Sequence, residues 1–127
     1  MNWPKHFQED CPPPEDSQPA RTYYFLVSRA EDPPSEDFLP LAERVDYKPK
    51  GSKSSRCRDC ALSVFVSQEA IRNFLVNRGE SLYSRVIAEM GVTAPFGKII
   101  RDNRPEGHCN WWLFEGQSFC QFFVRGL

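Results

Sequence analysis

The sequence predicts an α+β fold, with five or six strands in an antiparallel or mixed sheet and one main helix packed on one face. Two patterns support this prediction. Several short segments after residue 60 alternate apolar and polar side chains, as half-buried strands do, whereas 68–78 repeats its apolar residues at helical spacing. A length of 127 residues and an aromatic content of 13% favour one domain with a dense core.

The chain is expected to begin with an extended arm over 1–20, because this segment holds five prolines and few apolar residues. A single domain then covers 21–127. Its first strand is predicted at 22–29, where β-forming residues run up to a group of acids and prolines. Pro40 lies too deep for an uninterrupted helix, so a short turn and a broken helical piece are expected through Val45.

The segment 48–58 is the most basic part of the chain, with five positive charges and no acid. Such a composition is typical of a solvated loop. An alternative function is contact with a phosphate or an acidic partner, because Gly and Ser let the backbone and the cations close around an anion.

A strand followed by a helix is the clearest local pattern. Apolar residues alternate over 62–66, which predicts the strand. Ser67 is placed to cap a helix over 68–78, with Glu69 in its first turn, and Gly79 is suited to end it. The predicted buried stripe has the spacing i, i+3, i+4 and consists of Ile71, Phe74 and Leu75.

Further strands are predicted at 82–90 and 96–102. The segments 108–114 and 118–125 are expected to form a hairpin, with Gly116 supplying a positive φ in the turn.

The first residues lack the apolar core of a signal peptide, so a cytoplasmic location is expected. Because disulfides are rare in the cytosol, the five cysteines are expected to be free or metal-bound. No apolar run approaches the length of a membrane span. Cys57 and Cys60 have the spacing of a zinc-ligand pair, and His108 and Cys109 are available to complete the site. The alternative is that these cysteines are loop thiols and small core residues.

Charge is divided along the chain. Residues 1–46 hold ten acids and four bases (net −6) and the remainder seven acids and twelve bases (net +5), which gives the total of −1. The balanced total argues against a protein that coats nucleic acid. The acidic front and the basic segment favour complementary surfaces for a protein partner.

Catalytic signatures are few. The sequence contains no GxSxG, GxxxxGK[ST], GxGxxG or HExxH, which argues against most hydrolases, P-loop nucleotidases, Rossmann dehydrogenases and zincins. His108 lies beside the pair Trp111 and Trp112, where an imidazole can act as an acid or base or stack on a planar ligand. The alternative is a structural histidine. Strand alternation places the two tryptophans on opposite faces.

Two short segments, Ala61–Phe65 (ALSVF) and Gly107–Leu113 (GHCNWWL), resemble a group of small bacterial proteins with a Gly/Ala-Leu-Ser-Val-Phe segment and a later Gly-His…Leu-Trp segment. The resemblance covers about residues 22–125 and implies no particular activity.

The order of residue types is also similar to the ADP-ribosyltransferase superfamily, with NAD as substrate. That resemblance implies a cation for the pyrophosphate at Arg29, a Ser-containing aromatic strand at Ser63 and Phe65, and a late acid at Glu106 or Glu115. The sequence departs from that superfamily in lacking a Ser-Thr-Ser triplet and a Gln/Glu-x-Glu pair.

Three functions are therefore expected, in this order: a non-catalytic interaction module of the immunity, antitoxin or regulatory type; an NAD-using effector resembling ADP-ribosyltransferases or glycohydrolases; and a zinc-stabilised binding domain. A site, if present, is expected to join candidate catalytic and ligand-binding residues in one cleft. These residues are Arg29, Ser63 and His108 for catalysis, and Tyr24, Phe65 and Trp112 for binding.

Overall fold

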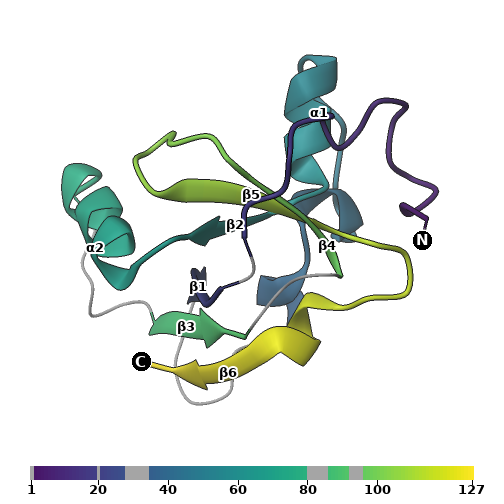
Figure 1. Ribbon diagram of the computed structural model, residues 1–127. Coiled ribbons are helices and arrows are strands. Elements are labelled where there is room, and N and C mark those ends of the chain that lie inside the picture. Colours follow the sequence, from purple (N-terminus) through teal and green to yellow (C-terminus); the bar gives the residue numbers. More distant parts are fainter. Residues whose placement is uncertain (1, 20, 28–34, 80–85, 92–95) are drawn as a thin grey trace.

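The computed structural model describes residues 2–19, 21–27, 35–79, 86–91 and 96–127 (Figure 1). Its six strands are β1 (Tyr23–Val27), β2 (Leu62–Phe65), β3 (Val86–Met90), β4 (Gly97–Arg101), β5 (His108–Leu113) and β6 (Phe123–Gly126). The helices are α1 (Lys53–Asp59) and α2 (Gln68–Asn77), and short 3-10 helices cover Ser35–Phe38, Leu41–Glu43 and Phe119–Phe122. The predicted α+β class is confirmed.

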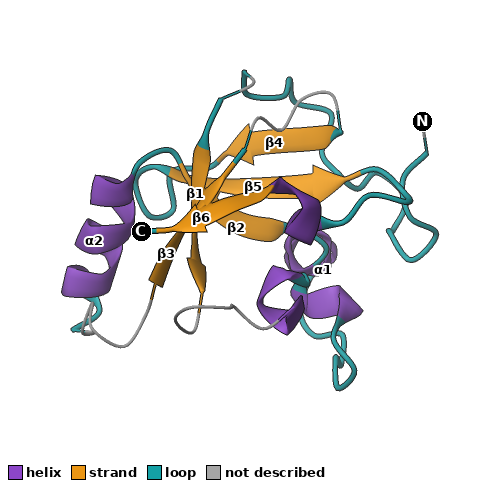
Figure 2. Cartoon of the chain, turned by 90° about the horizontal axis from the view of Figure 1, so that it is seen from below, coloured by secondary structure: helices purple, strands orange, loops and turns teal. Residues whose placement is uncertain are grey.

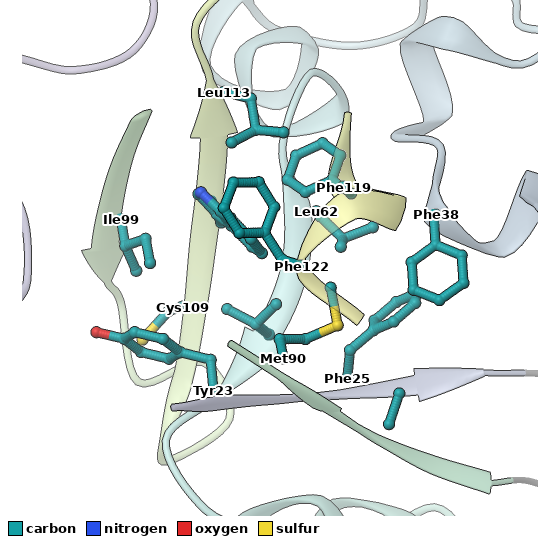
Figure 3. Packing of buried hydrophobic residues seen from close by; sticks show 13 residues of the cluster. Tyr23, Phe25, Phe38, Leu62, Met90, Ile99, Cys109, Leu113, Phe119 and Phe122 are labelled. Carbon is teal, nitrogen blue, oxygen red and sulfur yellow. The ribbon is translucent and has the colours of Figure 1, made fainter. Parts of the chain in front are cut away.

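The strands form one antiparallel sheet in the order β4-β5-β2-β1-β3-β6. Side chains from β2, β4 and β5 meet side chains from β1 and β3 in the main core, as Figure 3 shows. Trp111 lies at its centre and is fully buried, with the rings of Phe119 and Phe122 packed edge-on against it.

Helix α2 confirms the predicted main helix. The hydroxyl of Ser67 accepts a hydrogen bond from the backbone N–H of Ala70 and caps the N-terminus. Ile71 and Leu75 are fully buried against Phe65 and Ile87. Helix α2 and helix α1 are well separated, with the strands between them (Figure 2).

Helix α1 replaces much of the loop expected over 48–58. The hydroxyl of Ser52 caps this helix by accepting from the N–H of Ser55. Cys57 and Cys60 follow three residues apart, so both side chains turn to the same side and are buried there. This short apolar face holds the basic segment against the domain.

The hairpin predicted between 108–114 and 118–125 is wrong. Strand β6 pairs with β3 instead, in a register that sets Arg125 opposite Glu89. The physical reason lies in the 3-10 helix Phe119–Phe122, whose two phenylalanines have helical spacing and pack into the main core. This helix leads the chain away from β5.

The N-terminal segment packs on the domain along the outer edge of β4. The hydroxyl of Ser17 accepts from the N–H of Ile99, and the N–H of Gln18 donates to the Ile99 carbonyl. Trp3 stacks on Phe114 with ring centroids 4.4 Å apart. No helix of the described ranges is long and apolar enough to cross a membrane.

A disulfide joins Cys11 of the N-terminal segment to Cys57 of α1, with Cα atoms 5.6 Å apart. The expectation that the cysteines are all free or metal-bound is therefore wrong for this pair. Forty-six residues separate the two cysteines, so no local pattern in the sequence pointed to their pairing.

Candidate active site

A cleft of about 1000 Å³ lies over the face of the sheet opposite the main core. Ser63 of β2 and His108, Asn110 and Trp112 of β5 line it. Alternation along antiparallel strands sets these side chains on one face, because Ser63 is opposite Asn110 in the register of β2 and β5. The neighbouring residues Leu62, Val64, Cys109 and Trp111 face the main core instead.

Three side chains at this cleft form a hydrogen-bonded relay. The hydroxyl oxygen of Ser63 lies 3.0 Å from Nε2 of His108, and Nδ1 of His108 lies 2.7 Å from Oδ1 of Asp102. Ser63 is exposed, whereas the imidazole is only 11% exposed. The relay therefore runs from a partly buried carboxylate, through a buried imidazole, to a hydroxyl that a ligand can reach.

The environment of Asp102 keeps its carboxyl group ionised. Partial burial raises its pKa, but hydrogen bonds from His108, from the backbone N–H of Arg104 and from the side chain of Asn110 outweigh burial and lower the pKa below its usual value. The amide of Asn110 donates to Oδ2 at 3.0 Å, which leaves Oδ1 to face the imidazole.

The charge state of Asp102 determines which atoms of the relay donate hydrogen bonds and which accept them. An ionised carboxylate only accepts hydrogen bonds, so Nδ1 of His108 carries a proton. In the neutral imidazole Nε2 is then the acceptor, and the hydroxyl of Ser63 donates to it. This is the arrangement in which an imidazole serves as a general base toward a hydroxyl.

The turn between β4 and β5 places the acid beside the histidine. The N–H of Asp102 donates to the carbonyl of His108. Asn103 adopts φ 54°, and its side-chain oxygen accepts from the N–H of Gly107 and from Arg101. These bonds hold a turn in which residues 102 and 108 face each other across the hairpin.

The disulfide forms part of the wall of the cleft. The indole N–H of Trp112 donates to the carbonyl oxygen of Cys57 at 2.9 Å, and the tryptophan is only 2% exposed. Cys11, Cys57 and Ile100 pack around it. Trp112 thus supports the cleft from below and offers little surface to a ligand.

Charges of both signs line the cleft. The cations come from α1, the hairpin turn and the segment before α1, and the acids come mostly from the N-terminal segment. The cations are Arg44, Lys53, Arg58, Arg101 and Arg104, and the acids are Glu9, Asp10, Glu15, Asp59 and Asp102.

Ser63, His108 and Trp112, singled out from the sequence, come together at this cleft. Phe65 lies behind the histidine, with ring centroids 5.4 Å apart, and is buried beneath α2. Tyr24 is opposite Phe65 in the sheet, and neither ring is among the residues that line the cleft. Arg29 falls outside the described residues.

The residues considered for a late acid lie elsewhere. Glu106 is exposed in the turn after β4 and Glu115 is exposed after β5, and neither lines the cleft. The acid that does contact the histidine is Asp102.

The zinc ligands considered from the sequence do not come together. Cys57 is bonded to Cys11, and Cys109 lies in the main core on the face of the sheet opposite His108. Across the ranges that the structure describes, no group of three or more His, Cys, Asp or Glu side chains is arranged to hold a metal ion.

Sequence reasoning missed Asp102 and Cys11. Asp102 falls at the end of the strand predicted over 96–102. The signal for its role is its place in Asp102-Asn103-Arg104-Pro105, a turn-forming run shortly before His108. The partner of Cys57 had no comparable signal.

Comparison of the chain with protein-family models, with curated sequences and with solved structures finds no significant match.

Proposed function

We propose that the protein is a serine-dependent acyl-transfer enzyme, acting as a hydrolase when water is the acceptor. The observation that supports this proposal is the relay from Ser63 through His108 to Asp102, with the hydroxyl open to the cleft. Nucleophile, base and orienting acid are the three parts that such chemistry requires.

In the proposed reaction the oxygen of Ser63 attacks the carbonyl carbon of an ester while its proton passes to Nε2 of His108. The imidazolium then gives this proton to the departing alcohol, and an acyl-enzyme results. Water repeats the sequence, with His108 again as the base, and releases the acid and free Ser63. Asp102 is a positioning residue that holds the required tautomer.

Asn110 is the candidate donor to the oxyanion. It lies opposite Ser63 on the same face of the sheet, and its amide has a second N–H besides the one that Asp102 accepts. A donor beside the attacked carbonyl stabilises the negative charge that develops on its oxygen.

Covalent labelling tests the proposal. An alkyl fluorophosphonate loses fluoride to an activated serine oxygen, so mass spectrometry is expected to find one adduct, on Ser63. Ser54→Ala is the matched control, because Ser54 lines the same cleft without contacting the imidazole. Ser63→Ala is expected to abolish labelling, and Ser54→Ala to leave it unchanged.

The two histidines of the chain provide a second matched pair. His108→Gln is expected to slow labelling at least about 100-fold, the usual contribution of a general base. His6→Gln is expected to have no effect, because His6 is exposed and contacts Phe7. A folded wild-type protein whose Ser63 stays unlabelled would contradict the proposal and favour the interaction module expected from the sequence.

The disulfide also bears on location. Disulfides persist in oxidising compartments and are rare in the cytosol. We therefore propose that the protein works in an oxidising compartment, in place of the cytoplasmic location expected from the sequence. Thiol trapping in intact host cells tests this point, and Cys11 and Cys57 recovered as free thiols would contradict it.

A further inference from the structure

One side of the cleft is apolar. The segment 39–41 joins two 3-10 helices and contributes Leu39, Pro40 and Leu41 to the lining. Leu41 is 52% exposed and Leu39 is 36% exposed, so both leucines present apolar surface to solvent. Covering such surface is favourable, at roughly 25 cal/mol per Å².

Leu39, Leu41 and Ser63 line the same cleft. Strands β1 and β2 share one register pair, Tyr24 with Phe65, so their described parts do not pair beside Ser63. Phe25 of β1 and Leu62 of β2 belong to the lining, but they are only 7% and 4% exposed and pack in the main core. We call the surface formed by Leu39 and Leu41 the apolar recess.

The apolar recess is held in place by the fold. The ring of Phe38 packs against Phe25 (Figure 3). The two ring centroids are 5.5 Å apart. The side chain of Arg44 donates to the carbonyl of Leu39 at 3.2 Å, and the 3-10 helix Leu41–Glu43 contacts α1. The leucines are thus presented by a supported backbone.

The relay turn, which lines the same cleft, is polar. Asn110 and Asp102 lie there, followed by Arg104, whose side chain lines the cleft. An ester also has two parts, an acyl group and an alcohol. The apolar recess and the polar turn therefore suit the two parts of such a substrate.

Resting on the proposed function, we infer that the apolar recess binds the acyl chain of the substrate and that the alcohol lies toward Arg104. The substrate class is then esters of medium-chain fatty acids with polar alcohols. Acetyl esters would leave both leucines exposed and gain nothing from the recess.

Hydrolysis of p-nitrophenyl acetate, butyrate and octanoate tests the inference. We expect kcat/KM to rise with chain length in the wild type. Leu41→Ser is expected to lower the octanoate-to-acetate ratio of kcat/KM about tenfold, the usual effect of losing apolar contact in a pocket. Val45→Ser is the control, because Val45 is fully exposed four residues away and does not line the cleft.

Equal kcat/KM for the three esters, or a loss in Leu41→Ser that is the same for acetate and octanoate, would overturn the inference. Failure of the proposed function has a different signature, namely acetate hydrolysis that Ser63→Ala does not reduce.

Binding of sodium octanoate tests the recess without turnover. The methyl NMR signals of Leu39 and Leu41 are expected to shift with octanoate and not with acetate, and the shift of Leu39 is expected to shrink in Leu41→Ser. Unchanged methyl signals at millimolar octanoate would overturn the inference even if Ser63 proves reactive.

Discussion

Asp102 Oδ1 lies 2.7 Å from His108 Nδ1, across a turn that separates the two residues by six positions. The acid and the base therefore belong to one hairpin, whereas the nucleophile comes from β2, forty-five residues before the base. A single turn thus controls the orientation of the imidazole toward Ser63.

Replacement of Asp102 by Asn is expected to reduce fluorophosphonate labelling of Ser63 at least about 100-fold. The Asn side chain can donate to Nδ1, which moves the ring proton to Nε2 and removes the acceptor of the serine proton. Labelling rates at neutral pH check this, with circular dichroism to confirm folding. A rate equal to wild type would show that the carboxylate does not set the tautomer.

The same carboxylate is expected to make stability depend on pH. Its pKa is lower in the folded protein than its usual value of about 3.9, so ionised Asp102 stabilises the fold above that value. This contribution is lost as the pH falls through the folded pKa. The free energy of unfolding should differ between wild type and Asp102→Asn at pH 6, and the difference should shrink below about pH 4. A difference that is constant across this range would contradict the shift.

The Cys11–Cys57 disulfide is expected to stabilise the domain by about 2–4 kcal/mol, because it restricts a long loop of the unfolded chain. Guanidinium titration with and without a reductant measures this contribution. Reductant should destabilise the wild type and leave Cys11→Ser unchanged, since that variant has already lost the bond. An equal loss of stability in both proteins would show that the reductant does not act through the Cys11–Cys57 disulfide.

The remaining thiols are expected to differ in reactivity. Burial raises the pKa of Cys60 to about 11, with Asp59 and Glu43 adding to the effect, and burial likewise raises the pKa of Cys109 to about 11. Thiolate is the reactive form, so both thiols should react slowly with iodoacetamide near pH 7. Exposed Cys120 should react first, and Cys120→Ser should leave no fast phase. A fast phase that survives in this variant would contradict the assignment.

Gly107 and Gly116 offer a matched pair for the turn that carries the histidine. Both adopt positive φ, at 84° and 87°, but a Cβ at Gly107 would lie 2.7 Å from the Cβ of Ala70 whereas one at Gly116 meets nothing within 4 Å. Gly116→Ala is expected to cost about 1 kcal/mol for the backbone alone. Gly107→Ala is expected to cost about 1–3 kcal/mol more, because α2 must move. Equal unfolding free energies for the two variants would show that α2 can move away from a Cβ at residue 107 without a measurable cost.

The local elements can be predicted from the amino-acid sequence alone. Helix α2 follows from the spacing of Ile71 and Leu75 and from the cap at Ser67, because both signals lie within one segment of the chain. Alternation likewise predicted β2 and β5. Ser63 was singled out by the resemblance to ADP-ribosyltransferases, and His108 by its place beside two tryptophans. These features depend on neighbours in sequence, which is why a single chain reveals them.

The segments that meet from distant parts of the chain are seen only in the folded protein. Antiparallel pairing of β2 with β5 brought Ser63 to His108, and the turn before β5 added Asp102, which had been read as a strand end. The bond from Cys11 to Cys57 and the pairing of β6 with β3 were equally hidden. Each depends on side chains buried together across long stretches of chain, and periodicity within a segment holds no information about which segment will cover it.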